Sequence, residues 1–308
     1  MADCPYVLIT PARNEETFIE KTLESVTKQT LLPKRWVIVN DGSTDTTAEK
    51  VRPYLAKYPW IQMVDLPIHR ERSFAGKVYA FNAGMEVLKG VDYAVIANLD
   101  ADVLFDAEYF QFLINEFKKD QKLGVAGTIF REEGYSSETD SFEGEAHVSG
   151  GCQMFRRECF EQIGGYKPNK AGGIDWIAVT HARMVGWKTR AFREKAYFHH
   201  RRLGTAERGR LASSFSYGEK DYYLGGHPVW EFFRVAFRMT KPPYIVDGAA
   251  LGCGYVWAAI RRVHRPVSNE LMRFHRKEQM QKLGKILGSL LKFKKLNSFQ
   301  TGTVSNTR

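Results

Sequence analysis

The chain of 308 residues is long enough for one large α/β domain or for two smaller ones, and its hydrophobic share of 44% is ordinary for a globular protein. Its formal net charge of +10 is unevenly placed, because the segment from Arg261 to Arg308 holds 12 Lys or Arg against 2 Asp or Glu and so accounts for the whole excess. A neutral body with a basic tail argues against a general nucleic-acid-binding surface. It fits an anionic membrane face or an acidic partner instead.

The four cysteines lack metal-ligand spacing and are too few and too scattered for a disulfide scaffold; they are Cys4, Cys152, Cys159 and Cys253. The first residues show no basic segment followed by an apolar run, which a secretory signal would have. We therefore expect reduced thiols in a cytosolic protein.

The first half of the chain alternates between short apolar strands and segments with apolar residues at helical spacing. Strands are predicted at 6–10, 36–40, 61–66 and 93–99. Helices are predicted after Asn14, which is a plausible N-cap, then up to about residue 57, at 76–88 and at 106–118. This alternation predicts an α/β fold with a mostly parallel central sheet and helices on both faces.

The pattern changes after an apolar run at 124–130. Residues 131–151 are rich in Gly, Ser and Glu and predict a long loop, followed by a strand at 152–156, a helix at 174–186 and a strand at 188–193. The apolar, glycine-rich segment 245–260 contains Asp247 and is short for a spanning helix, so a core helix, a re-entrant segment and an interfacial segment all remain open.

A basic amphipathic helix is predicted at 268–291, where apolar residues form one stripe among Lys and Arg. The stripe consists of Met280, Leu283, Ile286, Leu287 and Leu290. This helix can bind an anionic membrane surface, or it can pack on the catalytic domain or on a second subunit.

Two carboxylates, Asp100 and Asp102, follow the apolar run at 93–97. In open α/β sheets, ligands bind beyond the carboxyl ends of the strands, so this is where a site is expected. Side chains two residues apart on an extended segment point the same way, and a divalent cation would offset the repulsion between these two. Mg²⁺ and Mn²⁺ prefer such oxygen ligands and join them to substrate phosphates.

Other strand ends carry polar groups as well, but the glycine-rich signatures of common nucleotide sites are missing. No Gly-x-Gly-x-x-Gly follows the first strand, which counts against a dinucleotide-binding site, and no P-loop sequence occurs. Phosphate would therefore have to be held largely through a metal. The polar groups near the other strand ends are Thr10, Arg13, Asn14, Glu15, Asp41 and Asp45, and Lys77 and Asn82 open and line the helix before the fourth strand.

Taken in chain order, these motifs resemble the family-2 glycosyltransferases with the GT-A fold, over about residues 5–200. The stretches that carry the resemblance are Thr10-Pro-Ala-Arg-Asn-Glu15, Val39-Asn-Asp-Gly-Ser-Thr-Asp45, Gly76-Lys77 with Asn82-Ala-Gly84, Asp100-Ala-Asp102, and Gly172-Gly-Ile-Asp175-Trp176 ahead of Gly186-Trp187. The resemblance implies a GT-A-like catalytic domain at 1–210. Beyond it we expect a helical, apolar extension at 211–260 that could contact a membrane, a basic amphipathic tail at 261–295, and disorder at 296–308.

The resemblance also implies how a nucleoside-diphosphate sugar would be bound. Asp41 would accept a hydrogen bond from the nucleobase, uracil or guanine, and Asp102 would be the direct metal ligand, with Asp100 near the ribose and the metal. Lys77 could support the sugar or phosphate side. The residues expected to bind the nucleotide-sugar are Pro11, Asn14, Glu15, Asp41, Lys77, Asp100 and Arg201.

Asp175 would be the general base, which takes a proton from an acceptor hydroxyl as this attacks the anomeric carbon and inverts its configuration. Many relatives have Glu-Asp at this point where this chain has Ile174-Asp175, which weakens the assignment of neighbouring contacts but not that of the base. In the basic stretch that follows, His199 is a candidate third metal ligand and Arg201 a candidate diphosphate clamp. A solvated basic loop is the equal alternative.

We therefore predict an inverting, Mg²⁺- or Mn²⁺-dependent hexosyl- or N-acetylhexosaminyltransferase that uses a UDP-sugar. Its expected acceptor is a glycan, either lipid-linked or an envelope polysaccharide precursor, and its expected place is the cytoplasmic face of the cell membrane. Two alternatives remain: a sugar nucleotidyltransferase, although its glycine-rich nucleotide loop is missing, and a non-catalytic membrane-associated scaffold that retains the fold.

Overall fold

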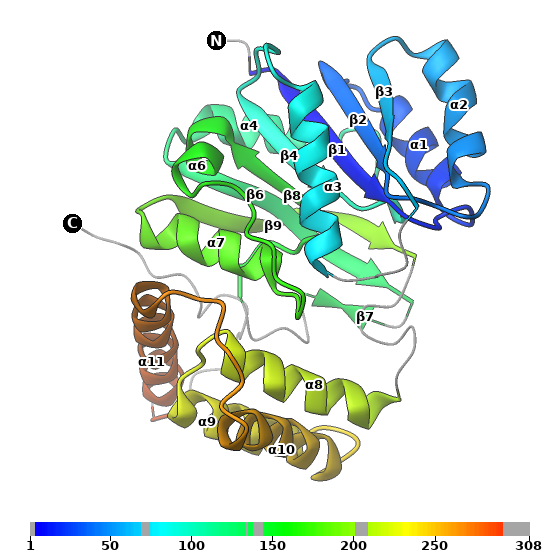
Figure 1. Ribbon diagram of the computed structural model, residues 1–308. Helices are drawn as coiled ribbons and strands as arrows, with labels where there is room; N and C mark the ends of the chain where they lie inside the picture. Colours follow the sequence, from blue (N-terminus) through cyan, green and yellow to red (C-terminus); the bar gives the residue numbers. More distant parts are fainter. Residues whose placement is uncertain (1–3, 69–73, 134, 138–143, 201–208, 292–308) are drawn as a thin grey trace. The chain divides into compact units, whose positions relative to one another are not determined.

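The computed structural model describes residues 4–68, 74–133, 135–137, 144–200 and 209–291 (Figure 1). The chain divides into two compact units, Met1–Arg201 (unit 1) and Arg202–Arg308 (unit 2). The predicted division into four segments stays a prediction, and the expected disorder at 296–308 falls outside the described residues.

Unit 1 alternates strands and helices, as predicted. Its strands are β1 (Tyr6–Ala12), β2 (Arg35–Asn40), β3 (Ile61–Asp65), β4 (Val95–Leu99), β5 (Val103–Leu104), β6 (Leu123–Glu132), β7 (Tyr135–Ser136), β8 (Cys152–Arg156) and β9 (Lys188–His199). Its helices are α1 (Ile19–Thr27), α2 (Thr47–Lys57), α3 (Phe74–Val87), α4 (Tyr109–Lys119), α6 (Arg157–Gln162) and α7 (Ile174–Met184).

Within the described residues, nine strands form one sheet in the order β3-β2-β1-β4-β8-β6-β9-β5, with β7 paired to β6. The strands β3, β2, β1 and β4 are parallel to one another. Strand β8 runs antiparallel to both its neighbours, and β9 is parallel to β6. The predicted α/β fold is confirmed, and the parallel half of its sheet comes from the helical crossovers of the first 100 residues. The other half is mixed.

Helices cover both faces of the sheet, which confirms that part of the prediction (Figure 1). Along β1, Tyr6 and Leu8 pack on one face with residues of α1, α2 and α4. Val7 and Ile9 pack on the other face with residues of α3, α6 and α7. A strand that is apolar on both sides is what a sheet buried between two layers of helices requires.

Three local predictions need correction. Asn14 is not a helix N-cap, because α1 begins after Phe18 and Asn14 has a positive φ of 56°. The segment at 131–151 is not a loop from its start, because β6 continues to Glu132. Strand β9 extends beyond residue 193 to His199, since an irregularity in its pairing with β6 lets Phe192 lie opposite Thr128 and Ala196 opposite Ile129.

Unit 2 contains the helices α8 (Arg210–Tyr223), α9 (Pro228–Met239), α10 (Val246–Ile260) and α11 (Asn269–Leu291). The predicted helix at 268–291 is confirmed, and the segment 245–260, whose structure the sequence left open, forms the helix α10. Helices α8 and α10 cross closely, because a Cβ at Gly254 would lie 2.0 Å from the carbonyl oxygen of Phe215, and one at Gly218 would lie 2.0 Å from that of Leu251. Only glycine permits this approach of two backbones.

The apolar stripe of α11 is partly buried in the protein. Leu283 and Ile286 are 7% and 3% exposed, whereas Met280 and Leu287 are exposed. Part of the stripe is therefore buried, and its binding to a membrane stays a prediction. No helix among the described residues is both long and apolar enough to cross a membrane.

Candidate active site

Asp100 and Asp102 lie directly after β4, and the structure brings His199 beside them. Strand β5 follows Asp102 and pairs with the end of β9, so that Val103 lies opposite His199. The backbone N–H of His200 donates to the carbonyl oxygen of Asp102 over 3.0 Å. The extension of β9 therefore carries the imidazole to the end of a strand that is far away in sequence.

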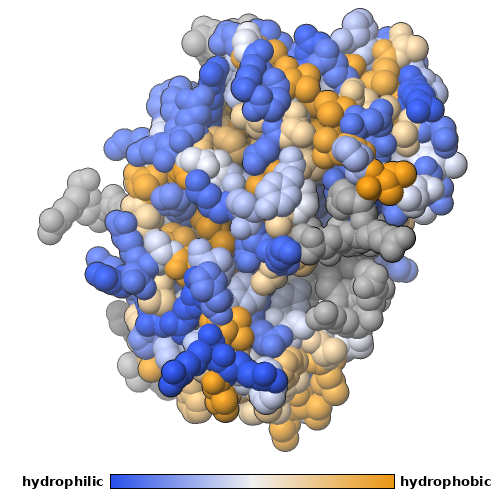
Figure 2. Space-filling model, viewed as in Figure 1, coloured by the Kyte–Doolittle hydropathy of each residue, from blue (hydrophilic) through white to orange (hydrophobic). Residues whose placement is uncertain are grey.

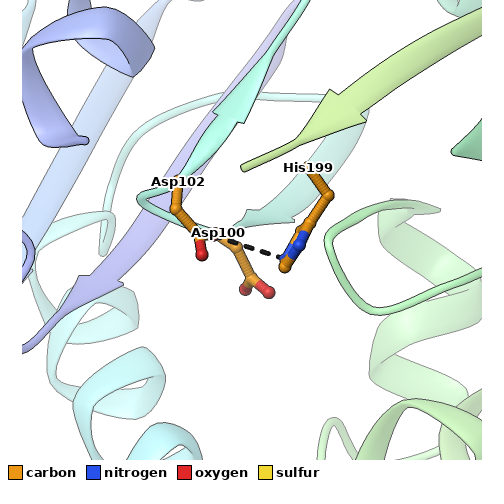
Figure 3. Close-up of side chains that lie close together, drawn as sticks. All are labelled: Asp100, Asp102 and His199. Carbon is orange, nitrogen blue, oxygen red and sulfur yellow. Dashed lines mark ion pairs between the residues drawn. The ribbon is translucent and has the colours of Figure 1, made fainter. Parts of the chain in front are cut away.

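The three side chains point toward one another and could hold a metal ion (Figure 3). One ligand atom from each lies within 4.8 Å of the others, and His199 Nε2 is 3.5 Å from Asp102 Oδ1. Asp102 and His199 are each only 5% exposed, whereas Asp100 is half-buried. A buried carboxylate and a buried imidazole beside a second, half-buried carboxylate are a donor set that suits Mn²⁺ or Mg²⁺ with substrate oxygens as further ligands.

Glu132, at the end of β6, is a functional candidate that the sequence did not reveal. Its Oε1 lies 3.7 Å from Nδ1 of His199, and the residue is 8% exposed. A carboxylate behind a ligating histidine fixes which ring nitrogen carries the proton and which faces the metal. In the sequence, Glu132 stands in Arg131-Glu132-Glu133, a charged run that is typical of a surface loop.

Lys77, in the first turns of α3, forms an ion pair with Asp100. Burial alone would lower the pKa of Lys77, but the negative charges of Asp100 and Asp175 outweigh it, and the pKa lies above its ordinary value. The ammonium group therefore stays charged and offsets the repulsion between the clustered carboxylates.

Asp175 lies in the first turn of α7, separated from Asp100 by a glycine pair. A Cβ added at Gly150 would lie 3.1 Å from Oδ2 of Asp175, while the Gly151 carbonyl oxygen accepts the backbone N–H of Asp100 over 2.9 Å. Asn98 Nδ2 holds the same segment by donating to the Gly150 carbonyl oxygen over 2.8 Å. The glycine pair thus lets the predicted base approach the metal-binding cluster.

Asp41 follows β2 and is 8% exposed, with its backbone N–H bonded to the Ala12 carbonyl oxygen over 2.8 Å. A Cβ added at Gly76 would lie 3.7 Å from Asp41 Oδ2. Because Lys77 comes next and pairs with Asp100, the start of α3 connects Asp41 with the metal-binding cluster. A nucleotide could extend along this line.

Hydrogen bonds of Asn14, Glu15 and Asp45 join the loop after β1 to the loop after β2. Asn14 Oδ1 accepts the backbone N–H of Thr44 over 2.8 Å, and the backbone N–H of Glu15 donates to Thr47 Oγ1 over 2.8 Å. Asp45 accepts the backbone N–H groups of Glu16 and Thr47. Asn14 thus organises the loop that carries Glu15.

The structure therefore brings together Asp100, Asp102, His199, Lys77 and Asp175, and it places Asp41 at the other side of the α3 start. Pro11 is half-buried in β1, where it lies opposite Val39. Arg201, the predicted diphosphate clamp, lies outside the described residues.

Comparison with known proteins agrees with this arrangement. The model of the family described as "Glycosyl transferase family 2" matches residues 7–164, slightly more than half of the chain. Poly-beta-1,6-N-acetyl-D-glucosamine synthase from Staphylococcus epidermidis is 28% identical over 198 residues, which cover 58% of this chain and 44% of the relative. The chain thus spans less than half the length of this curated relative.

Solved structures share the fold at low sequence identity. A mannosyltransferase from Pyrobaculum calidifontis, solved with GDP-Man and Mn²⁺, has a TM-score of 0.55 and 20% identity over 97% of this chain and 84% of its own. TarS 1–349 of S. aureus, solved with UDP-GlcNAc, has a TM-score of 0.54 and 14% identity over 97% and 89% of the two chains.

Proposed function

The chain belongs to glycosyl transferase family 2, and on this premise we propose that it transfers a sugar from a UDP-sugar to an acceptor hydroxyl with inversion at the anomeric carbon. The observation that carries the proposal is the approach of Asp175 to the cluster of Asp100, Asp102 and His199 across Gly150 and Gly151. A base beside a diphosphate-binding cluster is the arrangement that a single in-line displacement needs.

The donor lies between Asp41 and the metal-binding cluster. Asp41 accepts the imide N–H of uracil, and Lys77 balances charge on the phosphate or sugar side. The sugar is an N-acetylhexosamine, a choice supported by the curated relative named as a poly-beta-1,6-N-acetyl-D-glucosamine synthase and by the fold shared with TarS, which was solved with UDP-GlcNAc.

Asp100, Asp102 and His199 would hold Mn²⁺ or Mg²⁺. A bound cation supplies charge stabilisation for the diphosphate of the departing nucleotide. The protein contributes the orientation of its ligands: β4 fixes the two aspartates, and the pairing of β5 with β9 fixes the histidine.

Asp175 takes the proton of the acceptor hydroxyl. At the same time the hydroxyl oxygen forms the new bond to the anomeric carbon, and the bond between this carbon and the nucleotide diphosphate breaks. Asp175 lies in the first turn of α7, at the end of the helix where the macrodipole favours a negative charge. The acceptor is a glycan, as the name of the curated relative supports, either lipid-linked or a growing polysaccharide. Transfer takes place at a membrane surface on the cytoplasmic side.

Two substitutions test the reaction. Asp102→Asn should weaken Mn²⁺-dependent binding of UDP-GlcNAc, measured by calorimetry, and abolish transfer. Asp175→Asn should leave that binding within about twofold and lower the transfer rate by about 100- to 10,000-fold, which is the usual contribution of a positioned base. Nuclear magnetic resonance of the product would read the anomeric configuration.

Three results would contradict the proposal. Full transfer activity of the Asp175→Asn variant would show that Asp175 is not the general base. Release of pyrophosphate from a nucleoside triphosphate and a sugar-1-phosphate would indicate a nucleotidyltransferase. Absence of any nucleotide binding with Mn²⁺ would indicate a scaffold.

A further inference from the structure

Helix α10 exposes a face without a single charged side chain. The exposed positions include Val246, Cys253, Val256, Trp257 and Ile260, which recur at helical spacing. Ile260 is 72% exposed and Val256 is 54% exposed. Such a continuous apolar stripe on a protein surface marks a site of interaction.

Helix α9 packs beside α10 and extends the same kind of surface. Gly248 allows the close packing, because a Cβ there would lie 2.6 Å from Met239 Cγ. The exposed apolar residues of α9 and of the connection that follows it are Val229, Phe232, Phe237, Tyr244 and Ile245. Phe232 is 76% exposed, and Figure 2 shows hydrophobic side chains gathered at the lower edge of the view, where Figure 1 draws α9 and α10. We call this surface, with the exposed face of α10, the α9–α10 surface.

The charges around the α9–α10 surface are positive. Between Pro228 and Pro266 the only acidic residues are Glu231 and Asp247, and both are buried, at 4% and 0% exposure. Asp247 is further neutralised by an ion pair of 2.6 Å with Arg238. Nothing on this surface repels an anion.

Exposed cations stand at both ends of α10 and sit beside aromatic rings. Lys241 Nζ lies 5.3 Å from the ring centroid of Phe237, and the Arg261 guanidinium lies 4.7 Å from that of Trp257. Arg262 follows directly and is also exposed. Aromatic residues flanked by Lys or Arg are typical of segments at the boundary between lipid tails and headgroups.

We infer that the α9–α10 surface binds an anionic phospholipid bilayer, with α10 lying in the plane of the membrane. This inference rests on the membrane location in the proposed function and assigns it to a surface different from the basic tail. At about 1.5 Å per residue, the 15 residues of α10 reach less than the ~30 Å of a bilayer core. The helix is therefore too short to span and suited to lie in the interface.

Helix α11 is the weaker membrane candidate. Leu283 and Ile286 of its apolar stripe are buried in the protein, and so is Leu271 near the start of the helix. It also carries the exposed acidic residue Glu270. Because packing already buries part of this helix, less apolar area remains that could be buried on binding to lipid.

Co-sedimentation of the full chain with vesicles tests the inference. On vesicles of phosphatidylcholine and phosphatidylglycerol, Phe232→Glu with Val256→Glu should lower the partition coefficient by about 100-fold, since two inserted side chains are lost. The matched variant in α11, Met280→Glu with Leu287→Glu, should bind as the wild type does. All four positions are exposed, so the folded unit should tolerate the changes.

A second measurement places the helix directly. Brominated lipids should quench part of the tryptophan fluorescence of the wild type, and Trp257→Phe should lose that part. Wild-type binding by the Phe232→Glu, Val256→Glu variant would overturn the inference, and so would loss of binding by the α11 variant alone. A wild-type dimer that the α9–α10 variant turns into a monomer, without vesicle binding by either, would show that a second copy covers the surface. Mn²⁺-dependent nucleotide binding, measured on every variant, tests the proposed function separately.

Discussion

At the scale of single residues, the contact between Glu132 and His199 decides which imidazole nitrogen faces Asp102. Glu132 Oε1 lies beside Nδ1, which leaves Nε2 directed toward Asp102 Oδ1. Because the carboxylate holds the ring in this orientation, Glu132→Gln should weaken Mn²⁺ binding by about 10- to 100-fold, the usual effect of losing such a partner. Calorimetric titration with Mn²⁺ in the absence of nucleotide measures this.

The neighbouring Glu133 supplies the control, because it is exposed and carries the same charge. Glu133→Gln removes one negative charge at nearly the same place and should leave Mn²⁺ affinity unchanged. If both variants weaken Mn²⁺ binding equally, the effect comes only from the loss of a negative charge near the site, and Glu132 does not orient His199.

Which site residues could be predicted depends on what precedes them in sequence. Asp100 and Asp102 follow a strong apolar run, so their place at a strand end could be read directly, and the motif order indicated Asp175. Glu132 could not be found, because its charged neighbours hide the end of β6. The loop contact of Asn14 with Thr44 depends on a positive φ that no local pattern signals.

At the scale of elements, the segment before β8 sets the distance between α7 and β4. Gly150 faces Asp175 on one side, and the Gly151 carbonyl oxygen accepts the backbone N–H of Asp100 on the other. A methyl group at Gly150 would lie 3.1 Å from Asp175, tight enough to displace its carboxylate. Gly150→Ala should therefore lower the transfer rate by about 10- to 100-fold, since small displacements of a catalytic group cost that much.

The same variant should keep the binding of UDP-GlcNAc with Mn²⁺, because Asp102 and His199 are not moved. Gly284→Ala in α11 is the matched control, since a Cβ there meets nothing within 4 Å. A Gly150→Ala protein with wild-type transfer, or one whose nucleotide binding falls as far as its rate, would contradict this account of the glycine pair.

The parallel half of the sheet was predictable because each strand is followed by a helix that returns the chain to the same edge. The pairing of β8 between β4 and β6 was not, because it joins segments without such a crossover. The extension of β9 to His199 was hidden for a related reason: the irregular stretch after Phe192 interrupts the strand pattern.

At the scale of the whole molecule, composition located the positive charge but not the apolar surface. The count of Lys and Arg favoured the tail as the membrane contact, whereas the structure buries Leu283 and Ile286 there. The hydrophobic pattern of 245–260 fits a helix buried in the core as well as it fits a helix with an exposed apolar face. Only the packing of α10 against α8 and α9 reveals which side of the helix remains exposed.

The pH dependence of the stability of unit 2 should follow Glu231. Burial, together with the nearby carboxylate of Asp221 and against the charge of Arg234, raises the pKa of Glu231 from its ordinary 4.5 to about 8. The folded state then binds a proton that the unfolded state releases between these values. The contribution of Glu231 to stability is therefore full below about pH 4.5 and is lost as the pH rises to about 8.

Glu231→Gln replaces the protonated acid by a neutral group of the same shape and should remove this decline. Thermal unfolding followed from pH 5 to pH 8.5 should give equal Tm values near pH 5 and a Tm several degrees higher for the variant at alkaline pH. Glu270→Gln, at an exposed glutamate of the same unit, should follow the wild type because water solvates both of its forms. If Tm depends on pH in the same way in the wild type and in Glu231→Gln, this account is wrong. Arg234 would then keep Glu231 charged in the folded protein, although burial favours the protonated acid.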